Sequence, residues 1–412
     1  MGRALKIDEV GKNRVLRSRK ARNITRFALN KVASVRNPSP RDFQEMGRRV
    51  RRGFPTRPDS LRILLVTSNG AGLGHLSRVN AVSQFLTADS LIYTMSSAYK
   101  VLGRPPHGII YFPSYGDLGM AGSSWNAMMR AHFKAVFDAF DPDAVVFDGT
   151  FVYRGVVETV KKSPCPLIWI QRGCWRPEVD ANSDQRHNAS KYVDFVVVPG
   201  DYGNSEIVDE RSGVPTAYTS PIVSTQSLTS LSRTDARAEL GLPEGKKIFL
   251  VQLGAGLIND TKSIVDTAIS EINSLGDEWM PVLAKNPLSS TRATEVQSVQ
   301  RYPLAQYFNA FDCGIFAGGY NSCQEAVDMG LPSIFVPNLE TKTDDQARRA
   351  KGIEAAGYGF AALTEAEIRD RIRLIAEESK NLDIRNKLST AEPAEGALET
   401  ARIVEHIARY GE

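Results

Sequence analysis

Gly314–Gly359 reads GIFAGGYNSCQEAVDMGLPSIFVPNLETKTDDQARRAKGIEAAGYG, and this stretch decides the expected fold. It begins with a short apolar run typical of a buried strand, which ends at Gly318-Gly319, where the backbone can approach a ligand closely. Asn321 or Ser322 can then cap a helix, and a second strand, a polar loop and a second helix follow. Backbone N–H groups and the positive end of a helix would therefore lie beside an open pocket, an arrangement that suits a phosphate group.

The same alternation of strands and helices continues towards the N-terminus. Strands are expected at 61–67, 91–95, 109–113, 144–148, 166–170 and 194–198, with helices at 76–88, 123–140, 152–162 and 183–191. After a stretch rich in Pro, Ser and Thr at 213–235, strands are expected at 247–253 and 280–284, with helices at 261–274, 364–379 and 397–410. Strands that alternate with helices indicate parallel sheets covered on both faces. The expected fold class is therefore α/β, with two doubly wound Rossmann-like domains facing each other across a cleft.

These patterns divide the chain into four parts. Residues 1–60 form a basic N-terminal extension and 61–220 a first Rossmann-like domain, while 221–245 is an interdomain linker and 246–412 a second domain. Ligands of such sheets bind outside the carboxyl ends of the strands. One Gly-rich loop from each domain is therefore expected to border the cleft.

Composition is that of an ordinary soluble globular protein, with 42% hydrophobic and 24% charged residues. No apolar run approaches the roughly 20 residues that span a membrane, and no apolar segment follows the basic N-terminus, so a secretory signal is not expected. The four cysteines form no CxxC pair and lie in or beside apolar stretches. We therefore expect a cytoplasmic protein with reduced thiols and no metal site.

The net charge of +4 hides a strong asymmetry between the N-terminal arm and the rest of the chain. Residues 1–58 contain 17 Lys and Arg against 4 Asp and Glu, whereas the remainder is acidic. The arm is either a basic surface tail or a segment attracted to an anionic membrane, where each basic residue contributes about 1 kcal/mol near the surface. Nucleic acid is not an expected partner, because no recognisable binding fold accompanies the charge.

Residues 72–78, Gly-Leu-Gly-His-Leu-Ser-Arg, follow one predicted strand and precede a helix. As a dinucleotide-binding loop this segment lacks the third glycine and an acidic residue at the end of the next strand. His75 lies at the junction of loop and helix, where the helix N-terminus favours a neutral imidazole. His75 is therefore either a general base facing the cleft or a capping or packing residue.

Four acidic residues and one amide are further candidates for catalytic or ligand-binding roles, and each could instead have a purely structural role. Asp148 ends the strand AVVFD, where it could orient a histidine or cap the next helix. Glu325 could accept both hydroxyls of a ribose, or only stabilise a helix N-terminus by about 0.3–1 kcal/mol. Asp344, Asp345 and Gln346 suit the hydroxyls of a sugar, although Asp-Asp alone would also satisfy a plain helix start.

Two aromatic segments could border an acceptor pocket. Arg172 and Trp175 follow the fifth strand in the sequence QRGCWRP and could hold an anionic or sugar acceptor. Trp125 lies in the Gly- and Ser-rich segment GMAGSSWN. Packing within the core is the alternative role for the tryptophans.

A family resemblance rests on two of these motifs. The C-terminal pattern is Gly318-Gly319-Tyr-Asn-Ser322, Glu325-Ala, Gly330-Leu-Pro332, Pro337, Asp345-Gln346 and Ala350. Together with the 72–78 loop it resembles the family 28 glycosyltransferases, a group that includes the N-acetylglucosaminyltransferase that makes lipid II. The resemblance implies the GT-B fold, with an acceptor-side domain at 61–220 and a nucleotide-sugar-binding domain at 246–412.

The resemblance also assigns roles to individual residues. His75 would deprotonate an acceptor hydroxyl that attacks the anomeric carbon with inversion, and Asp148 stays the catalytic partner that the residue pattern alone suggests. The donor would be bound by Gly254, Gly256, Gly318, Gly319, Asn321, Ser322, Glu325, Asp345 and Gln346. On the acceptor side the resemblance covers only the 72–78 loop, with Gly72, Gly74 and Arg78. Trp125, Arg172 and Trp175 are acceptor-side candidates from their own sequence context, because the segment around Arg172 and Trp175 has no counterpart in the lipid II enzyme. Such enzymes need no metal or other cofactor, because backbone amides and a helix dipole stabilise the departing diphosphate.

This chain departs from the lipid II enzyme in both Gly-rich loops. The first reads Asn69-Gly-Ala-Gly72 where that enzyme has doubled glycines, and the second has Ala255 between its glycines.

From the motifs and the resemblance together we expect an inverting glycosyltransferase that uses a UDP-sugar, with UDP-N-acetylglucosamine as the candidate donor, and a hydroxyl acceptor on a cell-envelope glycan or glycolipid. It would work in the cytoplasm or at the inner face of the plasma membrane. A nucleotide-sugar 2-epimerase of the same fold and a non-catalytic nucleotide-sugar-binding subunit are the alternatives.

Overall fold

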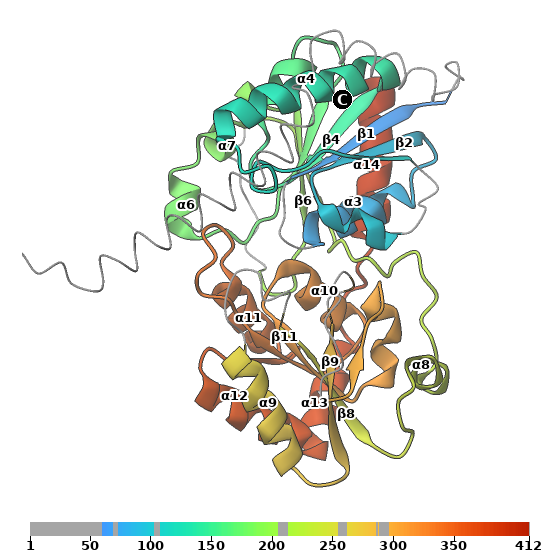
Figure 1. Cartoon of the computed structure of the whole chain (residues 1–412), viewed down its shortest axis with the longest axis vertical. Helices are drawn as coiled ribbons and strands as arrows, with labels where there is room; N and C mark the ends of the chain where they lie inside the picture. The colour runs from blue at the N-terminus through green and yellow to red at the C-terminus, as the bar shows by residue number, and fades with distance from the viewer. Residues whose placement is uncertain are drawn as a thin grey trace, which may run out of the picture.

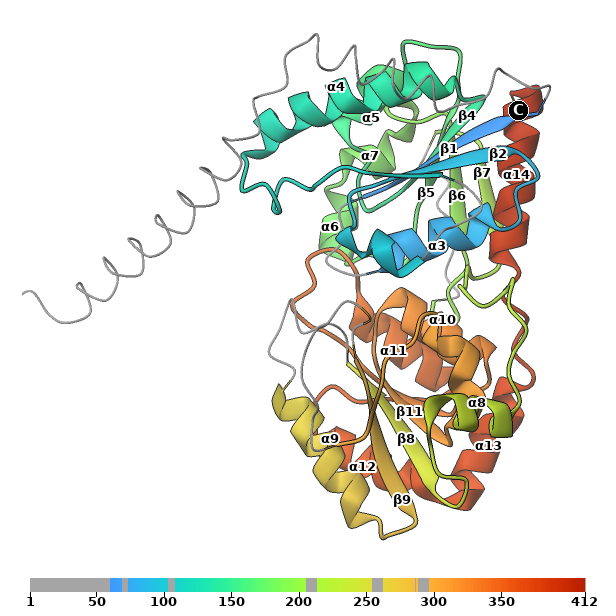
Figure 2. The same ribbon diagram turned by 45° about the vertical axis from the view of Figure 1, so that its right-hand side comes forward.

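The computed structural model describes residues 60–68, 73–102, 108–204, 213–253, 262–285, 287 and 296–411. In these residues the chain forms two β-sheets, each parallel throughout, with helices on both faces (Figure 1). The two layered bodies are stacked along the long axis of the molecule, and a second view shows the same division (Figure 2). The predicted α/β class is therefore confirmed.

The first sheet has seven strands in the order β3-β2-β1-β4-β5-β6-β7. Its strands are β1 (Arg62–Thr67), β2 (Asp89–Thr94), β3 (Gly108–Tyr111), β4 (Ala144–Asp148), β5 (Leu167–Ile170), β6 (Phe195–Pro199) and β7 (Thr216–Thr219). The surrounding helices are α3 (Gly74–Ser83), η1 (Ser97–Leu102), α4 (Gly122–Phe140), α5 (Arg154–Val160), α6 (Pro177–Ala181), α7 (Asp184–His187) and η2 (Ala189–Lys191). The chain order reverses between β1 and β4, which makes the space between their carboxyl ends a ligand-binding crevice.

The second sheet has six strands in the order β10-β9-β8-β11-β12-β13. They are β8 (Lys247–Gln252), β9 (Trp279–Ala284), β10 (Ser298–Val299), β11 (Cys313–Ala317), β12 (Ser333–Val336) and β13 (Phe360–Ala361). The remaining helices are α8 (Arg233–Leu240), α9 (Lys262–Ser274), η4 (Leu304–Ala310), α10 (Tyr320–Asp328), α11 (Gln346–Ala355), α12 (Glu365–Ala376), α13 (Glu378–Leu388) and α14 (Gly396–Tyr410). Here the reversal lies between β8 and β11.

Strand alternation explains how both faces of the first sheet are covered. Ile63 and Leu65 of β1 belong to a cluster with residues of α3 and α14, whereas Leu64 and Val66 belong to a cluster with residues of α4 and α5. Successive side chains of a strand point to opposite faces, so a continuous apolar run is required where both faces are buried.

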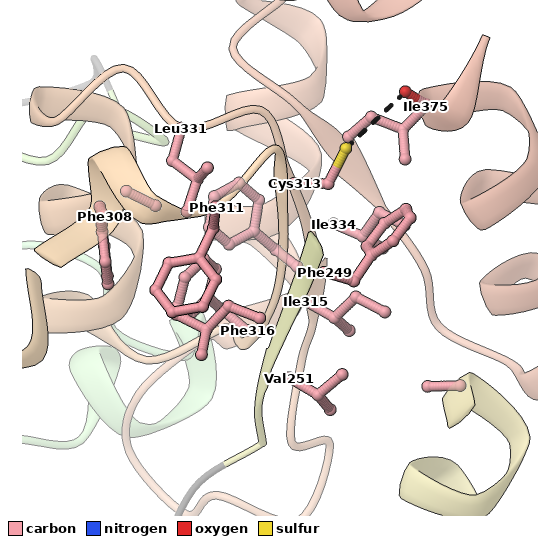
Figure 3. Packing of buried hydrophobic residues seen from close by; sticks show 14 of the residues in the cluster. Phe249, Val251, Phe308, Phe311, Cys313, Ile315, Phe316, Leu331, Ile334 and Ile375 are labelled. Carbon is pink, nitrogen blue, oxygen red and sulfur yellow. Dashed lines mark hydrogen bonds between the residues drawn. The ribbon is translucent and has the colours of Figure 1, made fainter. Parts of the chain in front are cut away.

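The second sheet has a core rich in phenylalanine. Phe249 of β8 and Phe316 of β11 are fully buried with Phe311, which precedes β11 (Figure 3). The neighbouring Cys313 thiol lies 3.9 Å from the carbonyl oxygen of Ile375, which places α12 against the same strand. This dense core fixes the end of β11, from which the Gly318-Gly319 turn departs.

Several expected boundaries differ from the observed ones. Strands β7, β10 and β13 are additional to the expected ones, and β7 lies in the stretch rich in Pro, Ser and Thr at the end of the predicted first domain. All three are short edge strands of two to four residues, which give almost no periodic apolar signal. The helix expected at 183–191 is divided into α7 and η2. The helix expected at 364–379 ends at Ala376, and a further helix, α13, begins at Glu378.

The C-terminal helix crosses back to the first sheet. Ala401 and Val404 of α14 are buried in the cluster that contains Ile63 and Leu65, and the helix lies along the upper body in both ribbon views (Figure 2). Residues 396–410 were expected to belong to the second domain, and their packing departs from that division. The other domain bounds stay a prediction.

Some predicted features lie outside the described residues. These are the basic extension as far as residue 59 and the loop glycines Gly72, Gly254 and Gly256. Among the helices that the structure describes, none combines the length and the apolar character needed to cross a bilayer.

Candidate active site

The crevice of the first sheet brings the two predicted catalytic residues together. Thr67 at the end of β1 pairs with Asp148 at the end of β4, so the loop that leads into α3 begins beside this carboxylate. A cavity of about 550 Å³ lies between the two bodies, and Gly74, His75 and Arg172 line its first side. The parallel register therefore places α3 and its histidine at the cavity.

His75 and Asp148 form a hydrogen-bonded pair at this edge. Nδ1 of His75 lies 2.7 Å from Oδ1 of Asp148. The same Nδ1 lies 2.8 Å from Nη2 of Arg78, which donates to Oδ1 of Asp148 at 2.7 Å. Because the Asp148 carboxylate only accepts hydrogen bonds, we assign the proton to Nδ1, which leaves Nε2 as the accepting nitrogen. Asp148 is 1% exposed and the His75 side chain 16%. This is the geometry of a general base held by a buried carboxylate.

Burial and neighbouring charge set the ionisation of the pair. Burial lowers the pKa of His75, and the adjacent Asp148 carboxylate offsets only part of that effect. Burial alone would raise the pKa of Asp148, but the Arg78 guanidinium and the hydrogen-bonded His75 together outweigh it and lower that pKa to about 2. At neutral pH the pair therefore consists of a neutral imidazole and an ionised carboxylate.

The Arg78 guanidinium, predicted to lie on the acceptor side, forms hydrogen bonds with other side chains of the protein. Its side chain is 2% exposed and donates through Nε to Oδ2 of Asp148 at 2.9 Å and through Nη2 to Oδ1 at 2.7 Å. Its third nitrogen, Nη1, donates to Oδ1 of Asn321 on α10 at 2.9 Å. Arg78 lines the cavity, but its donors are directed at protein groups.

The N-terminus of α10 forms the second side of the cavity. Gly319 is its N-cap residue, and no side chain caps the helix, so neither Asn321 nor Ser322 has the expected capping role. A Cβ on Gly319 would meet nothing within 4 Å, and Gly319, Asn321 and Ser322 all line the cavity. Gly318 does not line the cavity, and a Cβ added to it would lie only 3.0 Å from Cα of Pro337. An uncapped helix start presents N–H groups that suit an anion.

Glu325 lines the cavity one helical turn further along α10. Ser224 donates a hydrogen bond to its carboxyl group. Burial raises the pKa of Glu325 to about 7, and the hydrogen bond from Ser224 only partly opposes that shift. Near neutral pH this carboxyl group therefore exchanges a proton readily.

Two neighbours at the start of α11, Asp345 and Gln346, have different environments. Asp345 caps α11 by accepting from the Arg348 backbone N–H at 3.0 Å, and it does not line the cavity. Its contact with the donor sugar stays a prediction. Gln346 lines the cavity while its Oε1 accepts from the Asn338 N–H at 2.9 Å. No residue that the structure describes accepts a hydrogen bond from the Gln346 amide nitrogen, so this nitrogen could donate to a ligand.

The predicted aromatic acceptor residues belong mainly to the core. Trp125 is 3% exposed, and its indole N–H donates to a backbone carbonyl at 2.8 Å. Trp175 is 5% exposed, with the Arg186 guanidinium 4.6 Å from its ring centre. Neither lines the cavity, so the packing alternative holds for both. Arg172 does line it and lies 3.6 Å from Asp344.

A buried ion pair that the sequence analysis missed joins the two bodies. Arg349 of α11 is fully buried and donates to Asp201 at 2.6 Å and to Asp344 at 2.7 Å. Burial opposes the charge of Arg349, but the two carboxylates more than compensate and raise its pKa. Separated by 148 positions, Asp201 and Arg349 carry no local sequence signal of their pairing.

Among the residues that the structure describes, no group of three or more His, Cys, Asp and Glu side chains could hold a metal ion. The polar groups that line the cavity include the His75 imidazole, the Arg172 guanidinium, the Glu325 carboxyl and the Gln346 amide. Combined with the α10 N-terminus, they could bind an anionic sugar derivative and remove a proton from a hydroxyl.

Comparisons with known proteins give this arrangement a context. No protein-family model matches the chain. A relative from Symbiobacterium thermophilum is 21% identical over 374 residues, which cover 84% of this chain and 96% of the relative. It is named UDP-N-acetylglucosamine–N-acetylmuramyl-(pentapeptide) pyrophosphoryl-undecaprenol N-acetylglucosamine transferase. A relative of the same name from Bacillus subtilis is 26% identical over 62% of this chain and 71% of its own length.

Solved structures of glycosyltransferases share the fold. A spinosyn rhamnosyltransferase, SpnG, complexed with thymidine diphosphate superposes with a TM-score of 0.59 at 13% identity, covering 84% of this chain and all of that one. MurG from Acinetobacter baumannii gives 0.54 at 13% identity, covering 84% of this chain and 99% of its own. The predicted GT-B fold is therefore confirmed. The chain resembles the family 28 type of glycosyltransferase, as predicted, and the named relatives and structures are all glycosyltransferases.

Proposed function

We propose that this protein is an inverting glycosyltransferase that moves a sugar from a UDP-sugar to an acceptor hydroxyl. The observation that carries the proposal is the His75–Asp148 pair facing the uncapped N-terminus of α10 across a single cavity. One side can remove a proton from a hydroxyl, and the other can bind a diphosphate. UDP-N-acetylglucosamine is the proposed donor and a glycolipid of the cell envelope the proposed acceptor, since both occur in the names of the relatives.

The donor would lie along α10. The backbone N–H groups of Gly319–Ser322 and the Arg172 guanidinium would hold the diphosphate, together with the loop at Gly254 and Gly256. Glu325 would accept the ribose hydroxyls, and the Gln346 amide would contact the sugar. This arrangement explains why the N-cap residue of α10 is a glycine without a side-chain cap.

The reaction then needs one proton transfer and one displacement. Nε2 of His75 takes the proton of the acceptor hydroxyl while the acceptor oxygen attacks the anomeric carbon. The bond from that carbon to the diphosphate oxygen breaks, and UDP leaves with the electron pair. Attack on the face opposite the leaving group inverts the anomeric configuration. Asp148 stabilises the imidazolium, and the α10 N-terminus stabilises the departing diphosphate without a metal ion.

The 2-epimerase alternative is less well supported by these residues. It would use carboxylates in the cleft as acid and base. Among the described residues, the carboxyl groups that line the cavity are those of Asp344 and Glu325. Arg349 and Arg172 hold the pKa of Asp344 at about 2 against the raising effect of burial, so Asp344 cannot supply a proton near neutral pH. Glu325, with a pKa of about 7, can exchange a proton there, but an epimerase would need a second such carboxyl group. The accepting nitrogen of His75 has a direct use only where a hydroxyl is deprotonated.

The decisive experiment compares the parent protein with His75→Ala. The parent should turn over UDP-sugar in the presence of a lipid-linked or polymeric glycan, whereas the variant should lose about 10²–10⁴-fold in kcat. The Kd for UDP, measured by titration calorimetry, should be unchanged, because His75 lies opposite the donor side. Equal turnover in both proteins would contradict the proposed base, and an inactive parent with every UDP-sugar would contradict the proposed function.

The basic arm gives the proposal a second part. Residues 1–58 would attract the enzyme to anionic lipid, where a membrane-bound acceptor is presented. The full chain should sediment with vesicles that contain anionic lipid, and high salt should abolish the binding. A chain without residues 1–58 should remain in the supernatant; undiminished sedimentation would exclude this role for the arm.

A further inference from the structure

The amide of Asn321 links the start of α10 to both ends of the segment that carries His75. Its Nδ2 donates to the Gly74 carbonyl oxygen at 3.3 Å, and its Oδ1 accepts from Nη1 of Arg78 at 2.9 Å. One donor and one acceptor are thus each matched, which fixes the orientation of the amide. His75 lies between the two contacted residues in sequence, so the first turn of α3 is attached to α10 on both sides of the histidine.

The Arg78 guanidinium connects that amide to the carboxylate. Two nitrogens form a fork on Asp148, and the third reaches Asn321. The guanidinium carbon lies 5.2 Å from the centre of the Tyr320 ring, and the side chain is 2% exposed. A planar group with several fixed donors can make these contacts at once, whereas the single ammonium of a lysine cannot. The chemistry of this position therefore requires arginine and not merely a positive charge.

We propose that Arg78 is a positioning residue that couples the catalytic histidine of the first body to the donor helix of the second. Through its fork it holds Asp148, and so the His75 ring, and through Asn321 it fixes this pair relative to α10. The proposal rests on the proposed transferase function, which makes the distance between base and donor matter. It differs from the acceptor contact that the sequence suggested for Arg78.

Two effects follow from this position. The first is geometric: without the Asn321 contact, α3 and α10 can shift relative to each other, and small misplacements of reacting groups slow a reaction strongly. The second is electrostatic. The charged groups that act on His75 are Asp148 from β4, Arg78 from α3 and Arg172 after β5. Removing the positive charge of Arg78 would favour the protonated imidazole, which cannot accept a proton from the acceptor.

Three variants separate these effects. Arg78→Met removes both fork and charge, Arg78→Lys keeps the charge without the fork, and Asn321→Ala removes only the link to α10. Tyr202→Phe is the matched control, because it deletes a hydrogen bond to the Glu392 carbonyl that also joins distant parts of the chain but lies away from the cavity lining. For each variant, kcat is measured against pH, and the Kd for UDP is determined separately.

We expect Arg78→Lys and Asn321→Ala to lose about tenfold or more in kcat while the acidic limb of the pH profile and the Kd for UDP stay unchanged. Arg78→Met should in addition move the acidic limb to higher pH by about one unit or more. Tyr202→Phe should match the parent in all three measurements. The proposal would be overturned if Arg78→Lys kept the kcat of the parent protein. It would also be overturned if Asn321→Ala had the same kcat as the control Tyr202→Phe.

A measurement without substrate separates this proposal from the proposed function. The imidazole of His75 can be titrated by NMR in 15N-histidine-labelled protein, with His75→Ala to assign its signals. The parent should show a proton on Nδ1, and Arg78→Met should raise the pKa of His75. If the parent titrates in this way but lacks transferase activity, only the function fails; if Arg78→Met leaves the His75 pKa and tautomer unchanged, the role of Arg78 fails whatever the activity. Should Arg78→Met not fold, Arg78→Lys and Asn321→Ala still decide the geometric part.

Discussion

The two helix starts that meet at the cavity differ in how they use the same local structure. Both α3 and α10 follow a central strand of a parallel sheet, and neither has a side-chain cap. The first turn of α3 carries His75 and Arg78, whose polar atoms are joined to a buried carboxylate. The start of α10 instead contributes backbone, because its N-cap residue is Gly319 and a Cβ there would meet only open space.

This difference shows how one supersecondary unit supports two kinds of chemistry. Backbone N–H groups offer fixed partial charges that bind an anion but do not titrate. A proton acceptor must titrate, and its pKa depends on buried neighbours that only tertiary packing supplies. We therefore assign proton transfer to the α3 side and anion binding to the α10 side, and four predictions test that division.

The largest effect is expected from Asp148→Asn on the α3 side. The amide would accept poorly from Nδ1 of His75 and would leave Arg78 beside a neutral partner, so the wrong histidine tautomer becomes favoured. We expect kcat to fall by about 10³–10⁴-fold, with a lower melting temperature and an unchanged Kd for UDP. The measurements are steady-state turnover, thermal unfolding and calorimetry.

The control for that variant is Glu158→Gln, which removes an ion-paired carboxylate on the surface near Arg154. Exposed pairs contribute little, so its turnover and stability should match those of the parent. If Asp148→Asn had the same kcat as the parent protein, the residues of α3 and Asp148 would not carry out the proton transfer.

On the α10 side, Gly319→Val should block the anion without harming the fold. The new side chain has open space around its Cβ, and this space is where the diphosphate would bind. Turnover should drop by about a hundredfold, because the donors to the departing diphosphate become inaccessible, while the melting temperature stays close to the parental value. Gly318→Ala provides the contrast: its Cβ would lie 3.0 Å from Pro337, so stability should fall. UDP binding unaffected by Gly319→Val would place the diphosphate elsewhere.

Glu325 should make donor binding depend on pH. Its folded pKa of about 7 exceeds the ordinary value of 4.5, so the folded protein keeps a proton that the unfolded chain has lost between these values. The contribution of Glu325 to stability therefore falls as pH rises through that window. UDP affinity should rise by about tenfold between pH 6 and pH 8, as the ionised carboxylate becomes able to accept ribose hydroxyls.

In Glu325→Gln, both pH effects should vanish when urea unfolding and UDP titrations are repeated across this range. A parent whose UDP affinity does not change with pH would argue against Glu325 as the ribose contact.

The smallest effect separates two neighbouring residues on α11. Asp345→Ala should cost about 1 kcal/mol of stability through the lost helix cap and leave the donor Kd unchanged. Gln346→Ala should weaken UDP-sugar binding several-fold relative to UDP alone, because Gln346 lines the cavity. The free energy of unfolding and the Kd for the UDP-sugar are measured for both variants. Weaker UDP-sugar binding in Asp345→Ala would support the contact with the donor sugar that the sequence predicts for Asp345.

Much of the fold was predictable because its signals are local. The buried strands β1, β4, β8 and β11 are continuous apolar runs followed by Gly-rich turns, and each was expected close to its observed place. The edge strands β7, β10 and β13 gave no such signal, and the return of α14 to the first sheet depends on contacts with residues some 300 positions earlier. Amphipathic periodicity shows that a helix buries a face, but not against which sheet.

The sequence by itself determined that a histidine and a Gly-rich helix start would face a cleft, since strand ends and helix starts are set by neighbouring residues. Only the tertiary structure decided which polar groups line that cleft. Trp125 packs in the core, because burying its indole ring removes a large apolar surface from water. Asp345 caps α11, because its carboxylate accepts from a backbone N–H at the start of that helix. The structure also joined Arg78 to Asn321 and Arg349 to Asp201. Such pairs depend on distance in space, which a linear pattern does not encode.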